Sequence, residues 1–181
     1  AISLRRGLEK GFNKPRALTE AEILVIIKKF ATSAKLAQEA GFTGVQIHGA
    51  HGYLVSQFLS PRHNQRDDQW GGSLENRMRF VLAVYTAIRE QVGADFPIGI
   101  KLNSADFMKG GFSEEDSMQV VKTLADAGID LIEISGGTYE SPSMMGADVK
   151  ESTLQREAYF LDYAEKVRSQ VDTPLVVTGG F

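Results

Sequence analysis

Four short apolar runs, each preceded by a segment with helical periodicity, constrain the fold of this chain more than any other feature. Short runs rich in β-branched residues that alternate with amphipathic segments are typical of βα units with parallel strands. The predicted strands cover residues 42–49, 97–104, 129–137 and 174–180, and the predicted helices cover residues 19–40, 73–93, 113–128 and 155–171. The sequence therefore predicts an α/β fold.

Internal similarity supports repeated units. AGFTGVQI (residues 40–47) matches AGIDLIEI (residues 127–134), and PIGIKLN from residue 97 resembles PLVVTGG from residue 174. Repeated βα units build either a (β/α)₈ TIM barrel or a doubly wound sheet. Four strands are too few to close a barrel, which needs about eight. We therefore expect one partial-barrel domain over residues 1–181, belonging to a larger (β/α)₈ barrel.

The composition argues against several classes of protein. A net charge of −3 gives no reason to expect nucleic acid or an anionic membrane as a partner. No apolar stretch approaches the roughly 18–20 residues that cross a bilayer, and the first residues lack the apolar core of a signal peptide. The absence of cysteine removes disulfides, iron–sulfur ligation and thiol nucleophiles. We expect a cytoplasmic protein.

Two of the three histidines, His48 and His51, stand where the first predicted strand gives way to a loop, and Tyr53 follows. Such a pair is compatible with a metal site, with hydrogen bonds to neighbouring backbone, or with a polar ligand. Zinc needs a third ligand, and its common H-E-x-x-H motif lies on a helix. We therefore expect no metal. Two imidazoles and a phenol within six residues can instead bind a developing oxyanion and deliver a proton.

Lys101 lies inside the second predicted strand. Because lysine is rarely buried without a partner, it indicates either an anionic ligand or a salt bridge to an acid such as Glu133. Gly179 and Gly180 follow the last strand, where glycine lets backbone amides approach a phosphate. Most glycine pairs form only turns, so this signal is weak without other support.

Residues 64–80, NQRDDQWGGSLENRMRF, read as a charge-rich loop that leads into a helix. Ion pairs of Arg66 with Asp67 or Asp68, and of Glu75 with Arg77 or Arg79, would shape such a loop. We expect these charges to be structural.

The stretch AGFTGVQIHGAHGYLVSQFLSPRHNQRDDQWGGSLENRMRF is followed in order by IGIKLNSADF, LIEISGGTYE and VVTGGF. Together these blocks closely resemble the Old Yellow Enzyme family of FMN-dependent ene-reductases, over about residues 15–181. The resemblance implies a (β/α)₈ barrel with FMN at its C-terminal mouth and NAD(P)H as the reductant. It also implies hydride transfer to the β-carbon of a small activated alkene, such as an enone or a nitroalkene.

The resemblance also implies roles for individual residues. His48 and His51 would hydrogen-bond the carbonyl or nitro oxygen of the substrate, and Tyr53 would donate the proton to its α-carbon. Lys101 stands where the family commonly has an arginine that contacts the N1/O2 edge of the flavin. Lysine keeps the charge but lacks the planar fork of arginine.

By the same resemblance, Gly179 and Gly180 match the first part of the flavin-phosphate site, and the chain holds the fourth to the seventh barrel strands. We expect it to be part of a full enzyme, or a half-barrel that pairs with a second copy in a homo-oligomer. Light scattering that showed a compact monomer would reject the pairing. Two further alternatives stay open: a 2,4-dienoyl-CoA reductase-type barrel, and a catalytically silent fragment that cannot hold FMN alone.

Overall fold

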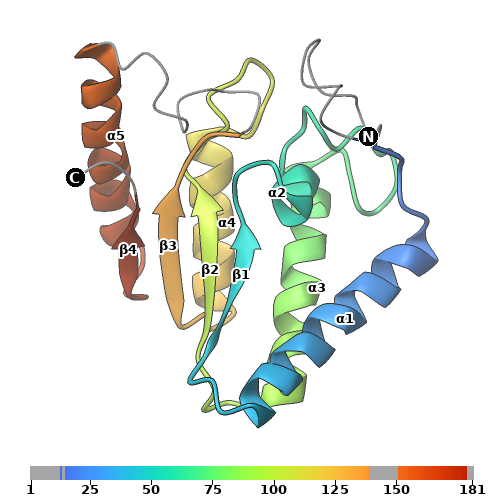
Figure 1. Ribbon diagram of the computed structural model, residues 1–181. Helices are drawn as coiled ribbons and strands as arrows, with labels where there is room; N and C mark the ends of the chain where they lie inside the picture. Colours follow the sequence, from blue (N-terminus) through green and yellow to red (C-terminus); the bar gives the residue numbers. More distant parts are fainter. Residues whose placement is uncertain (1–12, 14, 139–150, 179–181) are drawn as a thin grey trace.

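A four-stranded parallel sheet forms the centre of this computed structural model, which describes residues 13, 15–138 and 151–178. Its strands, adjacent in the order β1-β2-β3-β4 (Figure 1), are β1 (Val45–Gly49), β2 (Ile98–Asn103), β3 (Leu131–Ser135) and β4 (Leu175–Val177). Every neighbouring pair is parallel. The predicted α/β architecture of parallel βα units is confirmed.

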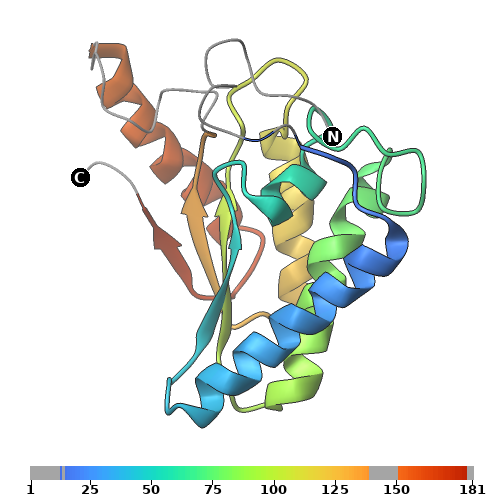
Figure 2. The same cartoon turned by 45° about the vertical axis from the view of Figure 1, so that its right-hand side comes forward.

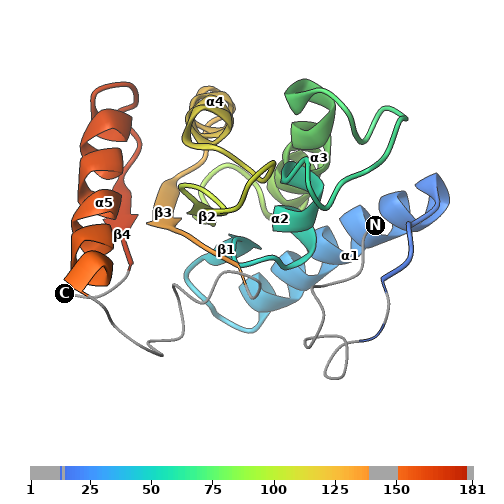
Figure 3. The ribbon, with the colours of Figure 1, turned by 90° about the horizontal axis from the view of Figure 1, so that it is seen from above.

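Helices precede the strands as the sequence predicts. They are α1 (Glu20–Glu39), α2 (Leu54–Leu59), α3 (Leu74–Val92), α4 (Glu114–Asp126) and α5 (Glu151–Arg168). Figures 1 and 2 show α1 beside α3, with α3 and α4 behind the sheet; seen from above in Figure 3, the strands follow an arc with α3 and α4 on its outer side. Two differences from the prediction are that α5 begins four residues earlier and that α2 lies in an expected loop.

Side chains at the first positions fix where the long helices begin. Thr19 accepts a hydrogen bond from the Glu22 backbone and Glu22 reaches back, which makes a capping box at the start of α1. Ser73 and Ser113 cap α3 and α4 in the same direction, each accepting a hydrogen bond from a backbone N–H three residues on. The helices therefore start where polar caps satisfy their first amides.

The two faces of the sheet differ in chemistry. Successive side chains of a strand point to opposite faces, and the strand register aligns two neighbouring rows of residues. We call the side packed against the helices the covered face; its row is Ile47, Ile100, Ile132 and Leu175. We call the other side the open face; its row is His48, Lys101, Glu133 and Val176.

The covered face holds the core. Ile47, Ile100 and Ile132 are each at most 2% exposed and belong to one cluster with apolar side chains of α1, α3, α4 and α5. On the open face, His48 is exposed, whereas Lys101 is half-buried. In the part of the chain that the structure describes, no helix combines the length and apolar character needed to cross a membrane.

Candidate functional site

The structure brings His48, His51 and Tyr53 together at the carboxyl end of β1. The ring centroids of His48 and His51 are 5.3 Å apart, with the rings nearly perpendicular at 84°. The Tyr53 ring lies 4.8 Å from that of His48, centroid to centroid. The sequence grouped these three residues, and the structure supports that grouping; their roles stay predictions.

His51 reaches this position through an unusual backbone. Its φ is +64°, in the left-handed region that residues other than glycine adopt infrequently, and Gly52 follows with a φ of +79°. The His51 N–H donates to Asn103 Oδ1 at 3.2 Å, and its ring Nε2 lies 2.7 Å from Ser135 Oγ. The backbone of His51 therefore contacts the end of β2, and its ring contacts the end of β3.

Partial loss of hydration, even for the more exposed His48, favours the neutral form of both imidazoles. Desolvation, reinforced by the nearby Lys101 cation, lowers the pKa of His51 to about 4 and also lowers the pKa of His48. Both rings are therefore neutral at pH 7, and each carries one N–H donor and one acceptor nitrogen. Such a pair can donate hydrogen bonds to a ligand oxygen without being charged itself.

Lys101 forms a salt bridge with Glu133, which is one of the two alternatives that the sequence allowed. Its Nζ lies 2.9 Å from Glu133 Oε1, and Gln46 Nε2 donates to Glu133 Oε2 at 2.8 Å. The Thr178 hydroxyl also donates to Glu133 Oε1. Partial burial alone would raise the pKa of Glu133, but the donors Thr178, Lys101 and Gln46 outweigh it and lower that pKa. The carboxylate is therefore ionised at pH 7, and the flavin contact of Lys101 stays a prediction.

Sequence reasoning missed two residues that hold the cluster. Asn103 and Ser135 are the last residues of β2 and β3, and they are buried, with 1% and 4% of their surface exposed. Each stands two positions after an open-face residue, Lys101 or Glu133, so each points to the same face. The two-residue spacing is visible in the sequence, but the partners of these side chains can be identified only once the strand register is known.

The charge-rich loop after α2 is structural, as expected, though not with all the expected partners. Arg66 pairs with Asp68 at 2.5 Å. The predicted pairing of Glu75 with a nearby arginine is wrong for Arg77, whose guanidinium lies 3.1 Å from Asp116 of α4. The physical reason is that Arg77 points inward, 6% exposed, where it joins two helices.

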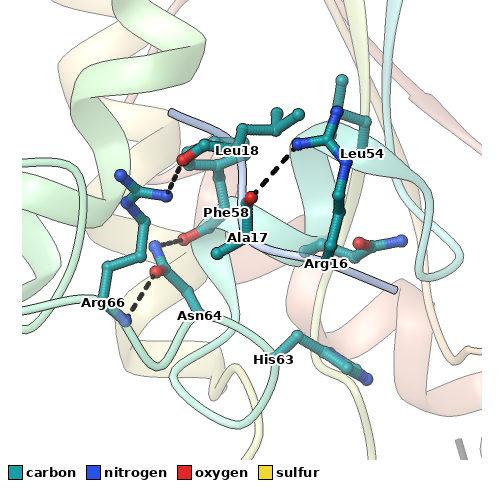
Figure 4. Close-up of a pocket in the computed structure, with 9 residues that line it drawn as sticks. Arg16, Ala17, Leu18, Leu54, Phe58, His63, Asn64 and Arg66 are labelled. Carbon is teal, nitrogen blue, oxygen red and sulfur yellow. Dashed lines mark hydrogen bonds between the residues drawn. The ribbon is translucent and has the colours of Figure 1, made fainter. Parts of the chain in front are cut away.

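A small cavity lies between residues 16–18 and α2 (Figure 4). Its volume is about 60 Å³, well below the roughly 300–1,000 Å³ of pockets for small molecules. Arg66 donates to the Leu18 carbonyl and Asn64 to the Phe58 carbonyl, each at 2.7 Å. These side chains serve the packing of the loop, so the cavity is not the candidate site.

No cluster of three or more His, Asp or Glu side chains suited to a metal occurs among the residues that the structure describes. Gly179 and Gly180, predicted to contact the flavin phosphate, lie outside the described residues.

Comparisons with known proteins agree with the architecture and the motifs. The model of the NADH:flavin oxidoreductase / NADH oxidase family matches residues 3–181. The NADH-dependent flavin oxidoreductase iliE of Hypocrea jecorina is 44% identical over 177 residues, which cover 94% of this chain and 43% of that protein. A solved complex of 2-naphthoyl-CoA reductase superposes with a TM-score of 0.72 at 32% identity, over 91% of this chain and 28% of that one.

The old yellow enzyme homologue from Zymomonas mobilis shares the fold, with a TM-score of 0.71 at 24% identity over 94% of this chain and 45% of that one. This chain thus spans less than half the length of each of these proteins. Its four parallel strands superpose on part of their barrels. Because the family model matches nearly the whole sequence, the chain belongs to the NADH:flavin oxidoreductase family, that of the Old Yellow Enzymes.

Proposed function

We propose that this chain supplies the substrate side of an FMN-dependent oxidoreductase that reduces activated C=C bonds with hydride derived from NAD(P)H. The observation that carries the proposal is the cluster of His48, His51 and Tyr53 at the carboxyl end of β1. Active sites of (β/α)₈ barrels lie at the carboxyl ends of their strands. Membership of the flavin oxidoreductase family supports the same chemistry.

The open face carries side chains of the kind that suits a flavin ring. Lys101 provides a cation, and Gln46 provides an amide, next to the donors of His48. These residues would hold the polar edge of FMN, which when bound supplies the hydride. Glu133 already compensates the charge of Lys101, so the site would offer this edge hydrogen bonds with little net charge.

The residues of the cluster divide the remaining chemistry between them. When the β-carbon of an enone accepts hydride, negative charge develops on the conjugated oxygen. N–H groups of His48 and His51 donate to that oxygen as its charge grows, which stabilises the transition state. The Tyr53 hydroxyl then gives its proton to the α-carbon and regains one from water. Tyr53 is 44% exposed, which leaves its ring open to solvent.

A second candidate function is the reduction of an unsaturated CoA thioester. The likeness to 2-naphthoyl-CoA reductase favours it. A thioester carbonyl conjugated to C=C develops charge on its oxygen just as an enone does, so the same donors would serve. The two candidates differ only in the group that the substrate carries beyond the carbonyl.

The test uses the natural full-length protein, purified and equilibrated with FMN. We expect a visible flavin absorption band and oxidation of NADH or NADPH that depends on added 2-cyclohexenone and yields cyclohexanone. Faster reduction of a dienoyl-CoA than of cyclohexenone would favour the second candidate. A colourless protein that oxidises no NAD(P)H with either substrate would overturn both and support a catalytically silent chain.

A further inference from the structure

The turn at His51 needs support from outside itself. A φ of +64° is sterically unfavourable for a residue with a β-carbon, and such backbones persist where surrounding contacts hold them. Within the turn, the Tyr53 N–H donates to the Ala50 carbonyl at 3.3 Å and the Gly52 N–H to Ser56 Oγ at 3.2 Å, but neither hydrogen bond involves the N–H or the ring of His51. The His51 N–H and ring contact side chains at the ends of β2 and β3, and a β-bridge pairs His51 with Thr138.

Asn103 provides the main contact through its side-chain amide. Its Oδ1 accepts from the His51 N–H at 3.2 Å. Its Nδ2 donates to the Gly137 carbonyl at 2.9 Å and to Asp106 Oδ1 at 3.2 Å. The amide thus joins the segments that follow β1, β2 and β3, and both of its donor hydrogens have a partner.

The position of Asn103 is fixed in turn by a fully buried carboxylate. Asp106 is 0% exposed, and its Oδ2 accepts from Ser60 Oγ at 2.6 Å and from the Phe112 N–H at 3.0 Å. The Asn103 backbone carbonyl also accepts from Ser117 Oγ of α4 at 2.8 Å. Rotating the Asn103 amide would leave buried polar groups unpaired, which is costly.

The imidazole ring has a second, separate contact. His51 Nε2 lies 2.7 Å from Ser135 Oγ, and Ser135 is 4% exposed at the end of β3. A hydrogen bond at one ring nitrogen fixes the orientation of a histidine and the nitrogen that carries its proton. Backbone and ring of His51 are therefore held by different residues.

We propose that Asn103 and Ser135 are the positioning residues of His51: the Asn103 amide holds its backbone in the left-handed conformation, and Ser135 fixes the ring that faces His48. The inference rests on the proposed function for its catalytic consequence, since His51 is there a donor to the substrate oxygen. Its structural part stands without that reaction and can be tested without it.

The experiment is NMR spectroscopy of the full-length protein, without substrate, with ¹⁵N in both the backbone and the rings of its histidines. A His51→Gln variant identifies the His51 signals. We expect Asn103→Ala to shift both the backbone amide and the ring nitrogens of His51. We expect Ser135→Ala to shift the ring nitrogens but to leave the backbone amide almost unchanged.

Ser117→Ala is the matched control, because it removes a buried hydrogen bond to the Asn103 carbonyl but leaves the Asn103 amide in place. It should lower the melting temperature without moving the His51 signals. If Asn103→Ala fails to fold, Ser135→Ala still decides the part that concerns the ring. Unchanged His51 signals in the folded variants would overturn the inference.

Steady-state kinetics separate this inference from the proposed function. In an active enzyme, Asn103→Ala should lower kcat/KM for an enone roughly 10–100-fold, the scale expected for a misplaced catalytic group. If the NMR signals shift but the natural protein reduces no alkene, the proposed function fails and the positioning role stands. If the protein reduces alkenes and the His51 signals do not respond, the positioning role alone fails.

Discussion

The covered face and the open face of the sheet are built by the same strands, yet they carry opposite chemistry. On the covered face, Ile47, Ile100 and Ile132 pack into the core with at most 2% exposure. One residue further along each strand, the open face carries His48, Lys101 and Glu133. Parallel strands covered by helices on both sides are apolar throughout, so the polar row sets the open face apart from the covered face.

Because the two faces differ in this way, we expect that stability and catalysis can be changed largely separately in this chain. Burial of aliphatic groups on the covered face stabilises the fold. Polar groups on the open face form hydrogen bonds with one another and leave donors near solvent. Substitutions in the apolar row of the covered face should therefore affect mainly unfolding, and substitutions of His48 or Tyr53 should affect mainly catalysis.

We expect the largest effect on catalysis from Tyr53→Phe, in the cluster at the carboxyl end of β1. Loss of the phenolic proton should lower kcat for an enone by about 10²–10⁴-fold, the usual contribution of general acid catalysis. Because Tyr53 is 44% exposed, the free energy of unfolding should change by only about 0.5 kcal/mol or less. Steady-state rates and urea unfolding measure the two quantities. A variant with an unchanged kcat would remove Tyr53 from the proposed reaction.

His48→Ala should have the next largest effect. Removing one donor to a developing oxyanion commonly costs about 10²–10³-fold in rate. Affinity for a carbonyl ligand should fall as well, whereas in Tyr53→Phe that affinity should hold. Comparing KM and kcat of the two variants separates the loss of affinity from the loss of rate. Equal patterns in both would contradict the division of roles between the imidazole and the phenol.

Ile100→Ala tests the covered face. The side chain is fully buried in β2, and truncations of this kind lower the free energy of unfolding by about 2–5 kcal/mol. Urea denaturation measures the loss. The NMR signals of His48 and His51 should stay in place in the folded variant. Large changes in those signals would show that the two faces are not independent.

Glu133→Gln should have the smallest effect, and it depends on pH. The folded protein lowers the pKa of Glu133, so its stabilising contribution is complete at neutral pH and is lost as pH falls below about 5. The variant should be less stable at pH 7 by roughly 1–3 kcal/mol, between the values for exposed and buried pairs. Its stability should also vary less with pH in the acid range. Parallel stability curves for both proteins would contradict this account of the Lys101 pair.

The sequence predicts the covered face well because apolar periodicity reports burial directly. Strands and long helices were found in this way, with α1 bounded by the residues that the pattern indicated. The short helix α2 was missed, because six residues are too few to show a helical period.

On the open face, the sequence predicts residues only where a local motif, or a single unusual residue such as the strand lysine Lys101, marks them. His48, His51 and Tyr53 lie within six residues, so their grouping was visible. Asn103 and Ser135 lie 52 and 84 residues from His51 and meet it only through the strand register. The partner of Arg77 was missed for the same reason, because Asp116 lies on another helix.

We propose that the residues at the carboxyl end of β1 take part in the reduction of activated alkenes. The most direct test separates the two half-reactions of the full-length, flavin-loaded protein by anaerobic stopped-flow absorption. We predict that 2-cyclohexenone reoxidises the reduced flavin in the natural protein, and that His48→Ala and Tyr53→Phe slow this step by about 100-fold or more. Reduction by NAD(P)H should stay near its natural rate in Tyr53→Phe. A reduced flavin that the enone does not reoxidise, or that it reoxidises as fast in the two variants as in the natural protein, would contradict the account.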